Sequence, residues 1–326
     1  MNNMTGIVDG MTNLSGNYPG NDLSLGSDLS QLVGGSITEY KGTPKWLIAL
    51  QKLGYKPYIA TSNYLYPLID ETPFGLSPDC FVLENSNHAS FLEAYRMSNS
   101  LSFENPGLKM PSWVLIDCVL LQTPIVGFMR KISDIPLDLL KHYQEASNID
   151  LSKMEYLPVT GQIASLGLDG KSLVGFSLFS LRSRLDGPKG LGLCTKALAF
   201  EVYRSLGYKQ FYGIAQYDNW SVRIHGRFAR YMEIHQPIVH VHPCKDMTFI
   251  YKMELDYDPY YLDRNKYLNS AEMQEPTFWM NAKDIDAKQR IEKSIQEGKK
   301  YIIAPPYLVK RDGELFLPII EKQGEF

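Results

Sequence analysis

Short apolar runs alternate with amphipathic segments from residue 113 to residue 255, and this alternation is the strongest constraint on the fold. The runs typical of strands are 113–121, 124–131, 156–166, 172–181, 209–216, 234–241 and 247–255. The segments with helical spacing of apolar residues are 136–146, 193–206 and 219–228. Hairpins are expected across Gln122-Thr123 and across 168–171. The pattern predicts an α/β (α+β) fold with a mixed, mostly antiparallel sheet flanked by helices.

The chain on either side of this core has a different character. Residues 1–40 are rich in Asn, Gly, Ser and Leu, so we expect a flexible lead-in whose apolar residues can still dock on the body. Residues 41–110 are expected to form a helical extension, with Thr43 capping a helix that ends before Gly54 and a second helix from His88 to Met97. The core is placed at 111–255. Residues 256–326 are expected to add a charged helix at 284–296 and a hairpin of 301–309 with 314–320.

Composition excludes several classes of protein. The formal net charge of −3 argues against affinity for nucleic acid built on phosphate neutralisation. No run approaches the roughly 20 apolar residues of a membrane span, and we expect no secretion signal. Four cysteines are scattered without a CxxC pair, which favours reduced thiols over a disulfide framework. We therefore expect a cytoplasmic globular protein.

The segment between the strand at 172–181 and the helix at 193–206 carries the clearest chemical signal. Its loop contains Gly187, Gly190 and Gly192, which let the backbone expose consecutive N–H groups. The helix N-terminus adds unpaired donors and a favourable dipole, so the unit suits a pyrophosphate. An ordinary tight turn is the alternative. The loop is neither a Walker A motif nor a dinucleotide fingerprint.

Two motifs here resemble the GNAT superfamily, the N-acetyltransferases of the acyl-CoA N-acyltransferase fold, over roughly residues 110 to 255. In the family signature Arg/Gln-x-x-Gly-x-Gly/Ala, Lys189 takes the first position, Gly192 the glycine and Cys194 the final small residue. The segment 217–228 is similar to the family's Asn-x-x-Ala…Tyr-x-Lys-x-Gly-Phe helix. Asp218 at the Asn position places His225 at the family's tyrosine; Asn219 is the other alignment.

The resemblance implies transfer of an acyl group, acetyl or longer, from acyl-CoA to an amine of a small molecule or protein. Backbone N–H groups near 179–182 would stabilise the oxyanion. Lys and Cys replace the family's usual loop residues, which leaves open a catalytically inactive CoA-binding sensor or interaction module. A homodimer is also left open. The implied cofactor-binding residues are Leu181, Arg182, Lys189, Gly190, Leu191, Gly192, Leu193, Cys194, Asp218 and Asn219.

Proton transfer needs an acid for the CoA thiolate and a base for the amine. His225 is the leading acid, with simple packing as the alternative. Tyr217 is expected beside it in the catalytic set, and Tyr212 is a further hydroxyl donor. Asp117 and Glu155 are candidate bases, and nothing in the sequence selects between them.

Other reactive residues are assigned structural roles. Cys194 is favoured as a small structural residue over a nucleophile, although a helix N-terminus lowers a thiol pKa. His240 and His242, with His235 nearby, have a spacing that can bind zinc, but a solvated strand is favoured and no metal is expected. The aromatic connector 257–267 and the Trp279 segment are expected to pack rather than line a pocket. The charges at 284–293 and 299–300 indicate a solvated helix face.

Overall fold

Thirteen strands join in one sheet in the computed structural model, which describes residues 29, 44–61, 82–85, 89–103, 109–110, 113–115, 124–146, 149–229, 232–237, 248–255 and 275–322. The strands are β1 Tyr55–Thr61, β2 Val82–Asn85, β3 Ile125–Lys131, β4 Tyr156–Pro158, β5 Thr160–Leu166, β6 Ser172–Ser180, β7 Gln210–Gln216, β8 Met232–Pro237, β9 Thr248–Glu254, β10 Phe278–Asn281, β11 Lys300–Ile303, β12 Val309–Arg311 and β13 Glu314–Lys322. The α-helices are α1 Lys45–Lys52, α2 Ala89–Ser102, α4 Leu137–Ala146, α5 Leu191–Ser205, α6 Ser221–Gly226 and α8 Ile285–Gln296.

The strand order is β10-β13-β11-β8-β9-β7-β6-β5-β3-β1-β2, with β12 on β13 and β4 on β3. Two neighbouring pairs are parallel, β1 with β2 and β6 with β7. The other pairings are antiparallel. The predicted mixed, mostly antiparallel sheet is therefore confirmed.

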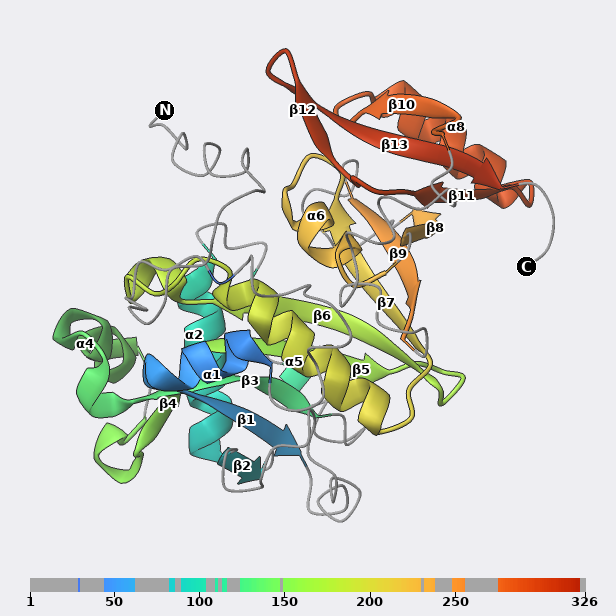
Figure 1. Ribbon diagram of the computed structural model, residues 1–326. Helices are drawn as coiled ribbons and strands as arrows, with labels where there is room; N and C mark the ends of the chain where they lie inside the picture. Colours follow the sequence, from blue (N-terminus) through green and yellow to red (C-terminus); the bar gives the residue numbers. More distant parts are fainter. Residues whose placement is uncertain are drawn as a thin grey trace.

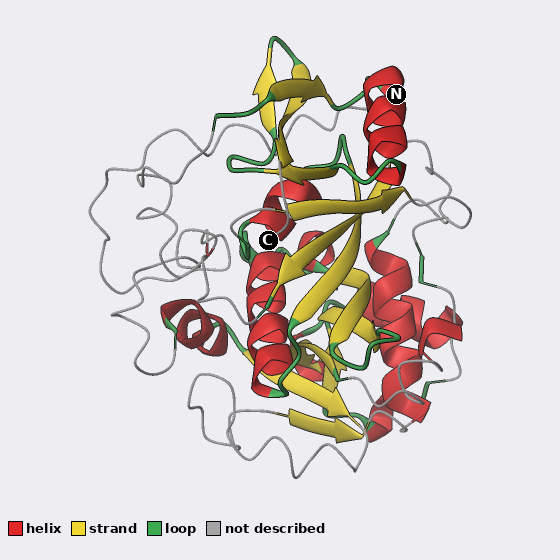
Figure 2. Cartoon of the chain, turned by 90° about the vertical axis from the view of Figure 1, so that its right-hand side faces the viewer, coloured by secondary structure: helices red, strands yellow, loops and turns green. Residues whose placement is uncertain are grey.

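Helices cover both faces of the central strands (Figures 1 and 2). Figure 1 shows α1 and α5 in front of the sheet and α2 behind it. On the front face, Trp46 of α1 contacts the Phe128 ring edge to face, and Thr195 of α5 hydrogen bonds Thr160 at 2.8 Å. On the back face, Tyr95 of α2 contacts Phe179 with ring centroids 5.0 Å apart. Burial of these apolar faces supplies the main stabilisation of the three layers.

The extension at 41–110 contains strands as well as the two predicted helices. Pro44 occupies the N-cap position of α1 without a side-chain hydrogen bond, whereas Thr43 lies outside the described residues. Gly54, at φ 80°, follows the helix and leads into β1. Because β1 pairs with β3 over six residue pairs, this extension is part of the sheet.

The hairpin predicted across Gln122-Thr123 is wrong at its start. Residues 113–115 are helical, and β3 pairs with β1, β4 and β5 instead. The ring centroids of Trp113 and Phe176 lie 6.0 Å apart, so this helical turn packs against β6. Short apolar runs have no unique period, and tertiary packing decides their structure. Residues 116–123 lie outside the described part.

The remaining elements agree with the predictions in type and differ at their ends. The run 156–166 divides into β4 and β5, and α5 begins at Leu191, two residues earlier than expected. β10 was not predicted. The C-terminal hairpin turns at Asp312 and Gly313, at φ 50° and 87°, and both β12 and β11 pair with the side of β13 that faces away from β10, as the predicted hairpin requires. Leu29 of the lead-in is fully buried in the core.

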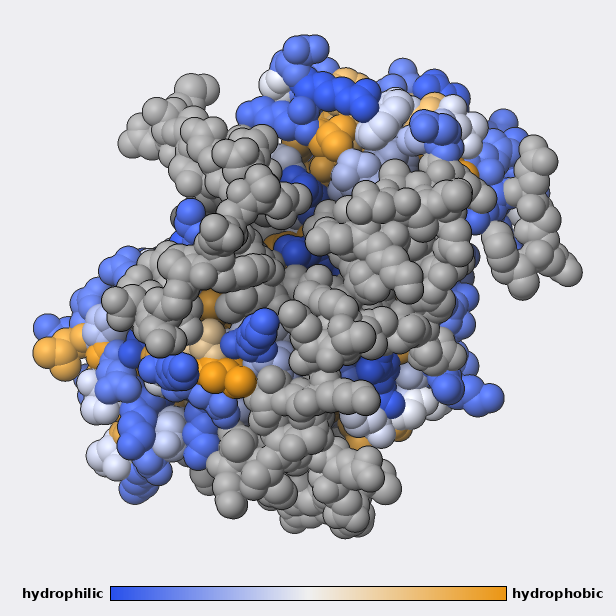
Figure 3. All heavy atoms as spheres, in the orientation of Figure 1, coloured by the Kyte–Doolittle hydropathy of each residue, from blue (hydrophilic) through white to orange (hydrophobic). Residues whose placement is uncertain are grey.

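The described surface is mixed in polarity. On the face in Figure 3, hydrophilic side chains predominate and hydrophobic ones form small separate areas. Within the part of the chain that the structure describes, no helix is long and apolar enough to cross a membrane.

Candidate functional site

β6 and β7 form a parallel pair that separates soon after it begins. The two strands are joined by α5 and pair from Ser172–Gln210 to Val174–Tyr212. β6 continues to Ser180 paired with β5, and β7 continues to Gln216 paired with β9. The second halves of β6 and β7 therefore have no ladder pairs between them, and among the described residues each has one backbone edge without a ladder partner.

A bulge at Phe176 accompanies this separation. Ile163 lies opposite Ser177, but Ala164 lies opposite Gly175, so Phe176 has no partner on β5. Bulges bend a strand and change its twist. Beyond Phe176, alternate residues of β6 direct their N–H and C=O groups away from β5. This edge can accept an extended chain that carries amide groups.

The N-terminus of α5 lies beside the end of that edge. A Cβ added to Gly192, in the first turn of α5, would lie 3.8 Å from Cβ of Ser180. Gly190 is the N-cap at φ 86°, and no side chain caps the helix. The N–H of Cys194 donates to the Gly190 carbonyl at 2.9 Å, so the donors before it are the orphan groups of the helix. A helix of 15 residues with half-exposed glycines at its start suits an anion.

The predicted loop residues contribute mainly through their backbone. Leu191, Leu193 and Cys194 have buried side chains, which places the Cys194 thiol in the core rather than at a ligand surface. Lys189 is exposed, and its carbonyl accepts the N–H of Leu29 at 2.8 Å. The lead-in therefore contacts the loop at this residue.

The expected oxyanion donors near 179–182 are partly engaged. The N–H of Leu181 donates to the Val159 carbonyl at 2.9 Å, and that of Arg182 donates to Ser180 Oγ at 3.3 Å. Backbone donors on β6 between the bulge and Ser180 are the better placed groups, since that stretch has no ladder pairs with β7.

Two arginines and a tyrosine, Arg130, Arg182 and Tyr55, form a basic cluster at the same ends of the strands, and the sequence patterns did not predict it. Arg130 at the end of β3 lies over the ring of Tyr55, with its guanidinium carbon 5.1 Å from the centroid. A Cβ on Gly187 would lie 2.7 Å from the Tyr55 hydroxyl and 3.6 Å from Cα of Arg182. The loop residue Arg182 therefore approaches Tyr55. Tyr55 lies at this position because β1 pairs with β3.

Asn219 and Asp218 lie at the turn between β7 and α6. Asn219 is exposed, and its Oδ1 accepts the N–H of Ser221 at 2.8 Å, so this residue stabilises the start of α6. Asp218 is half-buried. The two alternative alignments of this segment differ in which of these side chains faces a ligand.

His225 belongs to a buried polar network. Its Nδ1 lies 2.5 Å from Lys196 Nζ, which also donates to the Tyr251 hydroxyl at 3.2 Å. His225 is 8% exposed and Lys196 is fully buried. Burial and then the neighbouring Lys196 lower the pKa of His225, and burial lowers the pKa of Lys196 well below its usual range. The imidazole is therefore neutral at pH 7, which limits it as a proton donor.

Tyr217 is also buried, at the end of β7. Its ring stacks on Phe249 with centroids 4.3 Å apart, and its hydroxyl has no hydrogen-bond partner among the described residues. Burial raises the pKa of Tyr217, with a smaller contribution from Glu292, so the phenol stays protonated. Tyr212 is half-buried, and its hydroxyl lies 3.4 Å from Gln210 Oε1.

The other candidates are dispersed. Glu155 is exposed and lies 3.8 Å from Lys131 Nζ. His235 contacts the Tyr212 ring with centroids 5.0 Å apart, and within the described residues no group of His, Cys, Asp and Glu could hold a metal.

Trp279 packs under the Arg311 guanidinium, whose carbon lies 3.9 Å from the ring centroid. Most charges of α8 are exposed, but Lys288 is buried and pairs with Glu292 at 3.3 Å. Asp117, His240, His242 and 257–267 lie outside the described residues.

Searches against family models, curated proteins and solved structures find no match for this chain.

Proposed function

We propose that this chain binds acyl-CoA and transfers the acyl group to an amine. The observation that carries the proposal is the open edge of β6 after Phe176, which ends beside the uncapped N-terminus of α5. An acyl-CoA has matching parts, since a pyrophosphate suits the helix N-terminus and an extended arm with two amides suits a strand edge. The resemblance of 189–194 and 217–228 to the GNAT superfamily supports the same ligand.

Catalysis in this proposal is direct attack of the amine on the thioester. Backbone N–H groups of β6 beyond the bulge would stabilise the oxyanion, because they are fixed in direction before the charge develops. The departing thiolate needs a proton. Tyr217, whose protonated hydroxyl has no partner among the described residues, suits this role better than the neutral His225. The base that receives the proton of the amine is unassigned.

A CoA-binding sensor is the second candidate function. Both acid candidates are buried, which favours ligand binding without turnover. The two functions share the cofactor site and differ only in acyl transfer.

Titration of the chain with acetyl-CoA and longer acyl-CoAs tests the shared site. A ligand that binds only the folded state at 100 times its Kd stabilises it by about 2.7 kcal/mol, so Tm should rise by several degrees. Unchanged Tm at millimolar acyl-CoA would rule out the enzyme and the sensor together. If Tm rises, release of free CoA thiol with a panel of amines identifies the enzyme, and its absence identifies the sensor.

Tyr217→Phe and His225→Ala then separate the two acid candidates. Tyr217→Phe removes one hydroxyl without a partner among the described residues, so Tm should be unchanged or slightly higher. We expect thiol release to fall by about 100-fold, within the range of general acid catalysis. His225→Ala should lower Tm, because it leaves Lys196 and Tyr251 with a cavity between them. Full turnover in Tyr217→Phe would remove Tyr217 from the reaction.

A further inference from the structure

Arg130 and Arg182 are charged groups without a counter-ion in the described part of the chain. Both side chains are half-buried, and the Nε atom of each is buried without a hydrogen-bond partner. No ion pair joins either residue to a described carboxylate. Removing a guanidinium from water without a partner is costly, so such an arrangement stabilises nothing by itself.

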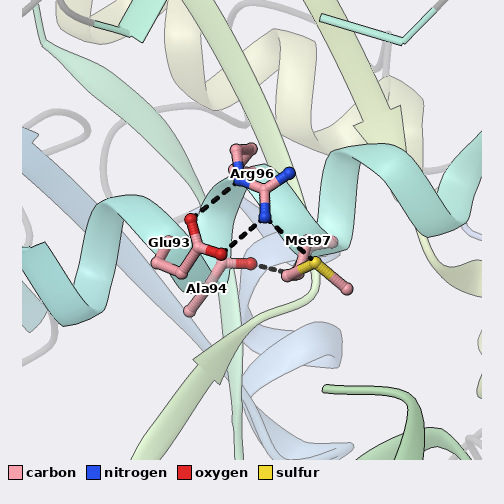
Figure 4. A network of polar contacts seen from close by, with 5 residues as sticks. Glu93, Ala94, Arg96 and Met97 are labelled. Atoms are coloured by element: carbon pink, nitrogen blue, oxygen red, sulfur yellow. Dashed lines mark hydrogen bonds and ion pairs between the residues drawn. The ribbon is translucent and has the colours of Figure 1, made fainter. Parts of the chain in front are cut away.

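Arg96 in α2 shows how this protein pairs an arginine when the role is structural. Its Nε donates to one carboxylate oxygen of Glu93 at 2.8 Å, and Nη2 contacts the other oxygen and the Met97 sulfur (Figure 4). This hydrogen bond to Glu93 raises the pKa of Arg96. Arg130 and Arg182 have no such acid among the described residues, although all three arginines are half-buried.

Arg130 and Arg182, which have no acidic partner among the described residues, converge on one buried phenol. Arg130 lies over the ring of Tyr55, and Arg182 approaches the Tyr55 hydroxyl across Gly187. Burial raises the pKa of Tyr55, and the positive charges of Arg130 and then Arg182 oppose this rise. The phenol is therefore a neutral donor between two cations, which is a set of groups suited to an anion with several oxygens.

The cluster lies at those ends of the central strands that are next to the N-terminus of α5. Tyr55 opens β1 opposite Arg130 at the end of β3, and Thr160 opens β5 opposite Ser180 at the end of β6. Arg182 follows Ser180 directly and stands in the loop that leads to Gly190. One ligand with separate phosphate groups can therefore reach the N-terminus of α5 and this cluster together.

We propose that Arg130, Arg182 and Tyr55 bind a terminal phosphate dianion of the acyl donor, at a position separate from the pyrophosphate at α5. In the proposed acyl-CoA this group is the phosphomonoester on the ribose, so the assignment to the donor rests on the proposed function. The binding of phosphate itself rests on the cluster alone. Planar guanidinium groups match phosphate oxygens and strengthen such bonds through charge.

Inorganic phosphate tests the cluster without CoA. We expect phosphate to raise Tm of the full chain above that in chloride of equal ionic strength, and Arg130→Gln and Arg182→Gln to abolish this rise. Arg184→Gln is the matched control, because it removes the same charge from an exposed position in the same short helical turn, 182–184. The site is rejected if phosphate has no effect, or if all three variants respond as the parent chain does.

CoA and dephospho-CoA test the assignment to the donor. We expect CoA to bind at least tenfold more tightly than dephospho-CoA, with this ratio close to one in Arg130→Gln and Arg182→Gln and unchanged in Arg184→Gln. Equal affinity of the parent chain for the two compounds would overturn the assignment. If neither compound binds, the proposed function fails, and the phosphate titration still decides whether the cluster is an anion site.

Discussion

The first two turns of α5 differ in whether their polar groups have partners within the described part of the protein. At its start the helix has an αL glycine and no side-chain cap, and Nε of Arg182 in the preceding loop has no hydrogen-bond partner among the described residues. One turn later, Thr195 hydrogen bonds Thr160, and the fully buried Lys196 hydrogen bonds His225 and Tyr251. The first group of residues faces a half-exposed edge, whereas the second is enclosed by the core.

This difference separates groups that complete the fold from groups that would bind the ligand in the proposed function. Buried polar atoms are costly unless they are paired, and Thr195 and Lys196 are paired within the protein. The first-turn N–H groups and the nearby guanidiniums remain without such partners in the described part of the chain, which is the property expected of a binding site. Substitutions in the second turn should therefore change stability, and those in the first turn should change binding.

The pH dependence of unfolding should show the largest effect, through Lys196. Its pKa in the folded state lies below that in the unfolded chain, so between the two values the unfolded chain binds more protons. The free energy of unfolding should then rise with pH in the range just below the ordinary lysine pKa of 10.5, by up to about 1.4 kcal/mol per pH unit. Urea unfolding at several pH values measures this slope.

Lys196→Met is the control for this slope. Methionine is apolar and of similar length, so the rise with pH should disappear in the variant. Above pH 10 the raised pKa of Tyr251 acts in the opposite direction, which sets the upper limit of the window. A parent chain and a variant with the same slope would show that Lys196 is protonated in the folded state.

Thr160→Val should show the next largest effect. The Thr160 hydroxyl oxygen accepts the Phe128 N–H at 2.9 Å and hydrogen bonds Thr195, so valine leaves a buried N–H unpaired. The expected loss is about 2 kcal/mol in the free energy of unfolding. Thr195→Val is the milder companion, because Thr160 still accepts from Phe128. Equal losses in the two variants would contradict the role of Thr160 as the link between α5 and the sheet.

Gly190→Ala and Gly192→Ala should separate stability from binding. Alanine at Gly190 must adopt φ near 86°, which should cost about 1 kcal/mol. Alanine at Gly192 meets only Ser180 at 3.8 Å and should stabilise the helix by up to about 1 kcal/mol. Its methyl group lies between α5 and the end of β6, so we expect CoA to bind about tenfold more weakly. Calorimetric titration and urea unfolding measure the two quantities, and unaltered CoA affinity in Gly192→Ala would place the ligand elsewhere.

Local patterns predicted most helices and strands of the central region. The amphipathic helix after Gly190, the turn at Gly170 and the strand at 210–216 follow from apolar spacing and glycine placement. The sequence did not predict β1, β10 or the helical turn at 113–115, because sheet pairing and side-chain packing decide such short runs.

The candidate site was predictable only where it is local. The loop from Arg182 to Cys194 could be found from its glycines. Arg130 and Tyr55 could not, because they lie 75 positions apart in the sequence and only the β1–β3 register brings them together. Burial of His225 likewise depends on tertiary packing, so its residue type alone suggested an accessible acid, whereas the burial of Cys194 agrees with its expected structural role.

A structure of the chain with CoA bound tests the central claim most directly. The account predicts the pyrophosphate within hydrogen-bond distance of the N–H groups at 190–193, and the pantetheine arm along β6 between Phe176 and Ser180. The thiol should then lie between the separated ends of β6 and β7. CoA bound at another surface, or backbone of the chain itself occupying that edge of β6, would contradict the account.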